Sequence, residues 1–300
     1  MLDRLMHRCW LRGIRLSIAQ GQLIVTHGSP GALDDELKAE LLARDAEVQQ
    51  WLQQHPDYFA ARPLTDNEQA LWFLQRLEPD SCAYNIAYAG RIKPQFVSQD
   101  LPQRLQDAWA TVQQRYPMLC TPYAERNGEL LQWSHRERVQ PLQCVPLQDA
   151  DAETLQQRIT ELADLPFKLE EGDVSRVVLL SNARDGHAEH TVLLVIHHIA
   201  ADLATFYIVL NELFALINDQ PLPAVNPDAY RDYCSDLHMR SEAAEPVELA
   251  WWQAQLAEAP ALELPTDFPY GSNQAFKSGE LSGRFDPATT ARFRAVAREL

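Results

Sequence analysis

The chain has 300 residues, of which 46% are hydrophobic, and this is enough apolar content for a substantial core in one large or two smaller domains. Its formal net charge of −16 argues against nucleic acid or an anionic membrane as a partner. The five cysteines are scattered without a CxxC pair, and no apolar run is long enough for a signal peptide core or a membrane span, so we expect a cytoplasmic protein without a disulfide scaffold.

A small separate unit is predicted for residues 1–55, in the order helix, hairpin, helix, helix. Apolar residues at helical spacing open the chain. Alternating apolar residues on both sides of Gln20-Gly21 then predict a β-hairpin. Acidic residues 34–36 begin the next helix, and a linker is expected over residues 56–63.

The start of the chain is basic, although the whole chain is acidic. Residues 1–28 have a formal charge of +3, from Arg4, Arg8, Arg12 and Arg15 against Asp3. The first three arginines recur every four residues and therefore share one helix face. This face is either simply solvated or a landing surface for an acidic peptide. Such a peptide could also pair by strand addition with the outer strand of the hairpin, which contains Leu23, Ile24 and Val25.

The rest of the chain alternates predicted strands and helices, which indicates an α+β fold. Strands are predicted over residues 84–92, 176–181 and 190–198, and a hairpin over 118–135 around Asn127-Gly128. Helices are predicted over residues 97–116, 152–163, 203–218, 228–240 and 246–258.

Residues 197–202, with the sequence HHIAAD, follow an apolar run that predicts a fully buried strand. Side chains alternate along a strand, so only one of His197 and His198 can open onto a cavity beyond it. The pattern offers one imidazole near neutral pKa with the carboxylate of Asp202 close behind. The alternative is a core histidine beside a surface histidine, with Asp202 acting only as a helix N-cap. Because the two side chains diverge, no metal site is expected.

HHxxxD followed by a helix resembles the active-site signature of condensation domains in nonribosomal peptide synthetases. Four further segments resemble the other motifs of that family in the same order: residues 64–74 with 83–86, 115–119, 166–176 and 230–233. The resemblance implies a chloramphenicol acetyltransferase-like fold of two similar halves. Residues 64–265 would be the first half and 266–300 the start of the second. We therefore expect a fragment of a longer polypeptide that is inactive alone.

The resemblance also implies a reaction, which is amide-bond formation between two carrier-bound thioesters. An upstream carrier protein presents the acyl donor and a downstream carrier presents the aminoacyl acceptor. Both use phosphopantetheine arms, so no cofactor is bound directly. In this family pattern His198 positions the attacking amine, with or without accepting its proton. His197 supports the strand, and Asp202 pairs with an arginine of the second half.

Three positions depart from the family pattern, and three alternatives stay open. Leu203 replaces a glycine and puts bulk in the substrate channel, Cys120 replaces an arginine, and Asp236 replaces a tryptophan. One alternative is a related HHxxxD acyltransferase that forms esters. Another is an epimerization domain, which a docking unit directly in front argues against. The third is a recruitment module with a degenerate site, for which Leu203 and Cys120 are the evidence.

Residues 1–55, with RGIRLSIAQGQLIV at their centre, resemble the N-terminal docking domains of the tubulysin-synthase type. This resemblance implies that the unit binds the C-terminal tail of the preceding synthase subunit. The alternative is a small structural extension of the catalytic domain.

Overall fold

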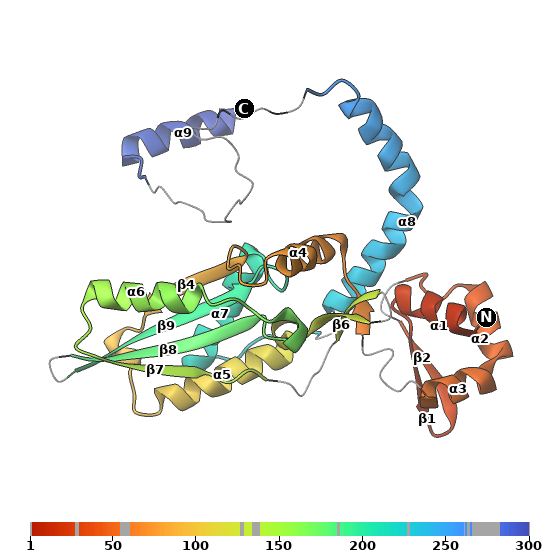
Figure 1. The fold of residues 1–300 in the computed structure, drawn as a ribbon, viewed down its shortest axis with the longest axis horizontal. Coiled ribbons are helices and arrows are strands. Elements are labelled where there is room, and N and C mark those ends of the chain that lie inside the picture. Colours follow the sequence, from red (N-terminus) through yellow and green to blue (C-terminus); the bar gives the residue numbers. More distant parts are fainter. Residues whose placement is uncertain are drawn as a thin grey trace. The chain divides into compact units, whose positions relative to one another are not determined.

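The computed structural model describes residues 2–27, 30–54, 61–126, 129–133, 139–184, 187–226, 229–260, 262, 265 and 283–299 (Figure 1). The chain divides into two compact units, Met1–Leu262 and Glu263–Leu300. In the described part of the second unit, helix α9 (Pro287–Glu299) follows Asp286, whose carboxylate accepts the Thr289 N–H at 2.9 Å. No helix among the described residues is both long and apolar enough to cross a membrane.

The first unit begins with the helix, hairpin, helix, helix order that the sequence predicts. Its elements are α1 (Leu2–Leu11), β1 (Arg15–Ala19), β2 (Gln22–Thr26), α2 (Asp35–Ala43) and α3 (Asp45–Gln54). The hairpin turns at Gln20 and Gly21, both with positive φ, as a two-residue type I′ turn requires. The Asp34 carboxylate caps α2 by accepting the Leu37 N–H at 2.8 Å. These elements share an apolar core that includes Leu5, Met6, Cys9, Ile14, Leu37 and Val48.

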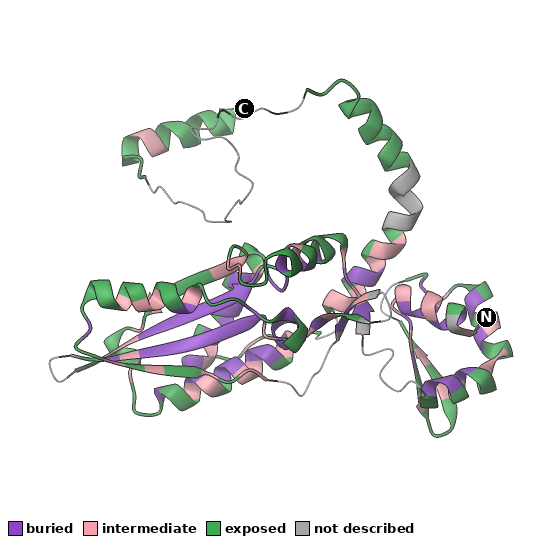
Figure 2. Ribbon diagram, in the orientation of Figure 1, coloured by how far each residue is buried: buried purple, intermediate pink, exposed green. Residues whose placement is uncertain are grey.

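A four-stranded sheet follows, in the strand order β4-β9-β8-β7. The strands are β4 (Asn85–Arg91), β9 (His187–His197), β8 (Ser175–Arg184) and β7 (Gln143–Gln148). β7 and β8 are parallel, and the other neighbours are antiparallel. The central part of β9 is buried at every residue from Thr191 to His197, so the sheet is covered on both faces (Figure 2).

Helices cover the two faces of this sheet. The Ser175 hydroxyl donates to the carbonyl of Leu119, which lies in the short turn after α5 (Leu101–Arg115). Helix α5 packs with α7 (Leu203–Ile217). The next residue, Arg176, points to the opposite face, where its guanidinium donates to the carbonyl of Leu162 in α6 (Ala152–Ala163). In α5 the buried residues recur at helical spacing: Leu101, Leu105, Ala108, Trp109 and Val112.

A second, three-stranded sheet has the order β3-β6-β5, with β3 (Ala61–Pro63), β6 (Glu129–Trp133) and β5 (Tyr123–Arg126). Helix α4 (Asp66–Leu77) starts with a capping box in which Thr65 and Glu68 bond each other's backbone N–H groups. Helix α8 (Ala229–Leu256) follows α7 along the chain, and short 3₁₀ turns η2 (Pro94–Phe96), η3 (Pro117–Cys120) and η4 (Leu169–Glu171) complete the fold.

The structure differs from the sequence prediction at several places. Residues 61–63, predicted as linker, form β3 and pair with β6. The two helices predicted around Pro246 are one helix, α8, because good helix formers on both sides carry it through. Residues 118–120, predicted as strand, belong to the turn η3. Strand β7 and helix α4 were not predicted. Asn127-Gly128 and residues 55–60 lie outside the described residues.

Candidate active site

The turn after β9 is fixed by hydrogen bonds from four consecutive backbone N–H groups. His197 N–H donates to the Val174 carbonyl and His198 N–H to the Tyr84 carbonyl, both at 2.8 Å. Ile199 N–H donates to Nδ1 of His197 at 3.0 Å, and Ala200 N–H to the His197 carbonyl at 2.9 Å. The turn therefore presents the His198 side chain from a rigid backbone.

His197 points into the protein and is 1% exposed. Its Nδ1 already accepts a hydrogen bond, so its proton resides on Nε2, which lies 3.3 Å from Oε1 of Gln75. The Phe167 ring meets the imidazole edge-on, with 6.1 Å between ring centroids. Burial, assisted by the neighbouring His198, lowers the pKa of His197 to about 4. His197 is thus a neutral, structural imidazole at physiological pH.

His198 points the other way and is exposed, as alternation along the strand requires. Asp202 is also exposed and caps α7, with its carboxylate accepting the Thr205 N–H at 2.7 Å. This hydrogen bond, and to a smaller degree the nearby His198, lower the pKa of Asp202. Leu203 begins α7 with 61% of its surface exposed. The exposed imidazole, the carboxylate and the leucine therefore come from consecutive parts of one strand–turn–helix segment.

Two residues that hold this segment were not singled out from the sequence: Gln75 in α4, and Tyr123 in β5, whose hydroxyl lies 3.4 Å from the Ile199 carbonyl. Tyr84, which lies in the motif segment 83–86, contributes its backbone carbonyl. For Gln75 a signal existed, because it lies three residues after the buried Trp72, on the same helix face. A polar residue on a buried face needs a hydrogen-bond partner.

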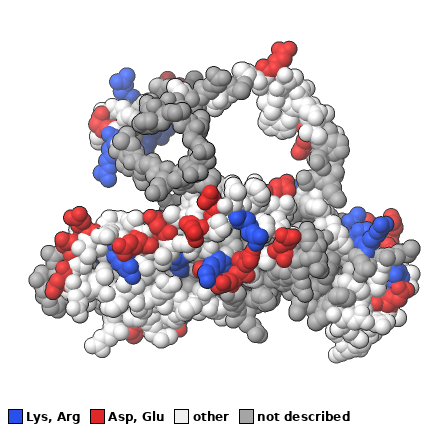
Figure 3. Space-filling model, in the orientation of Figure 1, with Lys and Arg blue, Asp and Glu red and all other residues white. Residues whose placement is uncertain are grey.

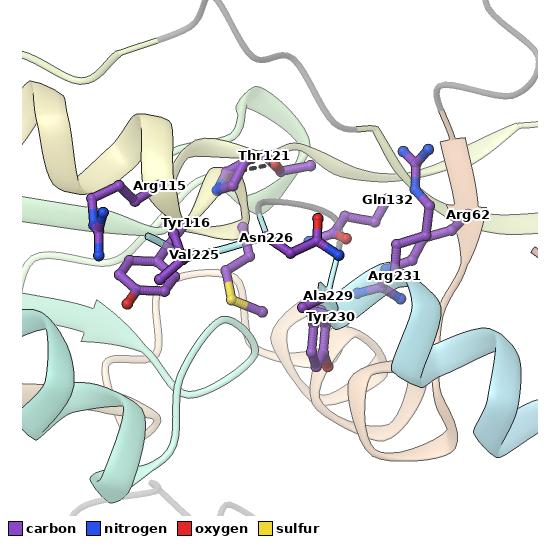
Figure 4. Close-up of a pocket in the computed structure, with 12 residues that line it drawn as sticks. Arg62, Arg115, Tyr116, Thr121, Gln132, Val225, Asn226, Ala229, Tyr230 and Arg231 are labelled. Carbon is purple, nitrogen blue, oxygen red and sulfur yellow. Dashed lines mark hydrogen bonds between the residues drawn. The ribbon is translucent and has the colours of Figure 1, made fainter. Parts of the chain in front are cut away.

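A pocket of about 330 Å³ lies apart from the histidine turn, and none of the predicted site residues lines it (Figure 4). It is bounded by β3, β6, the end of α5 and the start of α8, with Arg62, Tyr116, Gln132 and Tyr230 among the lining residues. Two of the arginines that line the pocket form ion pairs with carboxylates. Arg62 binds Glu68 at 2.6 Å, and Arg115 binds Glu212 at 2.8 Å.

The predicted basic face of α1 meets the acidic start of α2. Arg8 Nη1 lies 3.2 Å from the Glu40 carboxylate, and Arg12 Nη1 lies 2.5 Å from that of Asp34. Figure 3 shows basic and acidic side chains next to each other at this end of the molecule. Arg4 is exposed and Arg15 is half-buried. Arg8 and Arg12 are therefore already paired with carboxylates within the unit.

Strand β2 presents one large hydrophobic side chain and its backbone edge to the outside. Ile24 is 38% exposed, whereas the side chains of Leu23 and Val25 pack against the core of the unit. Ala19 and Gln22 flank the two-residue turn and so form a hydrogen-bonded pair, and such pairs alternate along the ladder. The backbone N–H and C=O groups of Leu23 and Val25 consequently point away from β1, toward the edge of β2.

Comparison with known proteins agrees with this geometry. A family model described as "Condensation domain" matches residues 61–300. One of the subunits of linear gramicidin synthase from Brevibacillus parabrevis is 31% identical over 249 residues, which are 79% of this chain but only 3% of that protein. The chain thus spans a few per cent of the length of such relatives.

Solved structures show a similar fold. Holo-AB3403, a four-domain nonribosomal peptide synthetase bound to AMP and glycine, aligns with 80% of this chain and 18% of its own chain, with a TM-score of 0.67 and 22% identity. The EpoB cyclization-docking bidomain from Sorangium cellulosum aligns with 86% of this chain and 53% of its own, with a TM-score of 0.52 and 19% identity.

Proposed function

The chain belongs to the condensation-domain family, and from this premise we propose that it forms an amide bond between an upstream carrier-bound acyl group and a downstream carrier-bound aminoacyl group. The assembly line would be a peptide or hybrid polyketide–peptide synthetase. The observation that carries the proposal is the exposed imidazole of His198 on a turn whose backbone is held at four successive N–H groups. The carrier proteins supply both phosphopantetheine arms.

In the proposed reaction, the acceptor amine attacks the carbonyl carbon of the donor thioester beside His198. A C–N bond forms and the C–S bond breaks, so the donor arm leaves as a thiol. His198 orients the amine, and its ring nitrogen can take the amine proton and return it to the departing sulfur. His197 is kept neutral by burial and anchors the turn, while Asp202 caps α7. Leu203 would border the acceptor and limit its size.

The experiment uses the full-length parent synthetase with both carriers loaded, and follows the condensed product by mass spectrometry. His198→Ala is expected to lower the rate by about two orders of magnitude or more, in the range of lost general acid–base catalysis. His190→Ala is the matched control, because it removes a second histidine from the same strand, where the ring bonds Ser181 at 2.9 Å. A wild-type rate for His198→Ala would contradict the proposal and favour the recruitment module, with Leu203 and Cys120 as signs of lost chemistry.

We further propose that residues 1–55 dock the C-terminal tail of the upstream subunit. Residues 61–300 are 240 of the 300 residues, or 80%, whereas the alignment with the EpoB cyclization-docking bidomain covers 86% of the chain. The aligned fold therefore begins before Ala61, which supports the docking assignment. The tail would add as a strand to the edge of β2, where the backbone groups of Leu23 and Val25 point outward. Ile24 would contact the tail, and the exposed Arg4 would attract its acidic residues.

Proline substitution tests which edge of the hairpin takes the tail, because proline lacks the N–H that strand addition needs. Val25→Pro removes an outward N–H from β2, and Ile18→Pro removes one from the opposite edge, on β1. Both residues are partly buried against the same core, so the two changes are matched. Calorimetry with the tail peptide should show at least tenfold weaker binding for Val25→Pro only. Normal binding by both variants would exclude strand addition.

We propose the cellular compartment from the oxidation state of the cysteines. The five cysteines all lie among the described residues, and no two of them, the exposed Cys144 included, form a disulfide. This supports a reducing compartment, which we take to be the cytoplasm.

A further inference from the structure

A row of buried polar side chains crosses the three-stranded sheet. Tyr123 on β5 lies directly opposite Gln132 on β6, and Gln132 lies directly opposite Arg62 on β3. Residues in direct register point to the same face of a sheet. All three are buried, with exposed fractions of 0%, 5% and 5%.

Hydrogen bonds engage both ends of this row. At one end, Nε2 of Gln132 donates to the Tyr123 hydroxyl at 2.8 Å, and that hydroxyl donates to the Ile199 carbonyl at 3.4 Å. At the other end, Arg62 donates twice to the Glu68 carboxylate, which also accepts the Tyr230 hydroxyl of α8 at 3.2 Å. The row therefore runs from the histidine turn to the first turn of α8.

Core stability alone does not account for such a row. A buried ion pair such as Arg62–Glu68 is often no more stable than apolar residues of similar volume. A buried tyrosine hydroxyl costs free energy unless it is hydrogen-bonded. Burial raises the pKa of Tyr123 well above its ordinary value, so its hydroxyl stays protonated and remains a donor. The row fixes the direction of one hydrogen-bond donor, the Tyr123 hydroxyl, and this donor meets the carbonyl of Ile199, the residue after His198.

We propose that Tyr123 is a positioning residue for His198, acting through the carbonyl of Ile199. The N–H groups of residues 197–200 are held by other parts of the turn and its neighbours, and the Tyr123 hydroxyl holds a carbonyl between them. Gln132 orients that hydroxyl, and Arg62 and Glu68 fix the strand that lies beside Gln132. The catalytic meaning of this positioning rests on the proposed function of His198.

The direct test needs no enzymatic activity. The 300-residue chain is prepared with isotope-labelled histidine, and the ring resonances of His198 and His190 are compared by NMR. Tyr123→Phe removes only the hydroxyl and should shift or broaden the His198 ring signals while those of His190 stay in place. Tyr116→Phe is the matched control, since its hydroxyl bonds Glu212 at 2.8 Å and does not reach the turn. Unchanged His198 signals in folded Tyr123→Phe would overturn the proposal.

Gln132→Leu gives a second route if Tyr123→Phe does not fold. It leaves Tyr123 in place but removes the amide that orients its hydroxyl, so the same His198 signals should change in the same direction, to a smaller extent. Unchanged signals in a folded Gln132→Leu chain would count against the row as an orienting device.

The effect on catalysis is measured in the full-length parent synthetase. Tyr123→Phe should lower kcat roughly ten- to hundredfold, as expected for a misplaced catalytic group, with the KM for the acceptor carrier unchanged. Tyr116→Phe should leave both constants unchanged. Full activity of His198→Ala would contradict the proposed function. The NMR comparison would then still decide whether Tyr123 positions the turn. Full activity of Tyr123→Phe beside an inactive His198→Ala would end the positioning role.

Discussion

His197 is locked in one tautomer by Ile199, whose backbone N–H donates to Nδ1 over 3.0 Å. The ring proton is therefore on Nε2, facing Oε1 of Gln75 at 3.3 Å. An imidazole held at both nitrogens cannot also serve a substrate. The different roles of His197 and His198 thus follow from the hydrogen bonds of the turn.

Removal of the His197 ring should destabilise the fold. His197→Ala creates a cavity and leaves the Ile199 N–H and the Gln75 carbonyl oxygen without this partner, at a combined cost of about 3 kcal/mol. Urea denaturation of the 300-residue chain measures the loss. His190→Ala is the control and should cost less, because His190 is only partly buried. Equal losses would mean that the buried hydrogen bonds of His197 contribute little.

Lowering the pH should destabilise the fold through the same histidine, His197. Burial lowers the pKa of His197 from its ordinary value of 6.5 to about 4, so between these pH values the unfolded chain binds one more proton than the folded chain. Stability therefore falls as the pH falls through this window, by up to about 3 kcal/mol in total from this group. His197→Gln lacks this contribution, while the carboxylates are common to both proteins. The difference in unfolding free energy between wild type and His197→Gln should shift in favour of the variant between pH 6.5 and 4. A constant difference would contradict the lowered pKa.

The predictable part of the site is the part that local periodicity encodes. The apolar run before His197 predicts a buried strand, and alternation alone sends His197 and His198 to opposite sides. The hairpin at Gln20-Gly21 and the cap at Asp202 are equally local. By contrast, Tyr123 meets Ile199 across 76 residues and Gln75 meets His197 across 122, and no sequence period carries contacts of that range.

The arginines of α1 also show that sequence spacing does not identify the partner of a side chain. Spacing of four residues places Arg8 and Arg12 on one helix face, but it does not say what faces them. In the fold that neighbour is the acidic start of α2, 22 to 32 residues later. Short strands were missed for a related reason, since β3 has only three residues, too few for an alternating pattern.

The buried pair Arg62–Glu68 predicts a strong asymmetry between single and double substitutions. The two side chains are 6% and 4% exposed, so Glu68→Met leaves the Arg62 charge buried without its partner, at a cost of about 3–5 kcal/mol. The double variant Arg62→Met/Glu68→Met removes both charges and should recover most of that loss. Urea denaturation of the wild type, Arg62→Met, Glu68→Met and the double variant completes a double-mutant cycle. Additive losses would show that the pair is not coupled.

Exchanging the charges of Arg12 and Asp34 distinguishes two roles of Arg12, which are pairing within the unit and binding the tail of the upstream subunit. Its guanidinium pairs with Asp34, so Arg12→Glu both breaks that pair and removes a positive charge that an acidic tail could use. The double variant Arg12→Glu/Asp34→Arg restores the pair and keeps positive charge at this end of α2, but loses the Asp34 cap. Asp34→Ala removes the cap while Arg12 stays in place, and it serves as the control for that loss. If Arg12 acts only inside the unit, tail affinity in calorimetry should recover in the swap; continued weak binding at low salt would assign Arg12 to the tail itself.

One series of variants separates the role of Asp202 as a helix cap from the role of its negative charge. Its carboxylate accepts the Thr205 N–H at 2.7 Å, so Asp202→Ala should destabilise the chain by about 1 kcal/mol, the usual cost of losing an N-cap. Asp202→Asn keeps an oxygen that can accept the same hydrogen bond and should stay near wild-type stability, apart from a small loss of charge at the start of α7. In the full-length parent, condensation by Asp202→Asn at a rate close to wild type would mean that capping is the role of this residue. A large loss of rate in a stable Asp202→Asn enzyme would instead show that the negative charge is needed, as the expected pairing with an arginine of the second half requires.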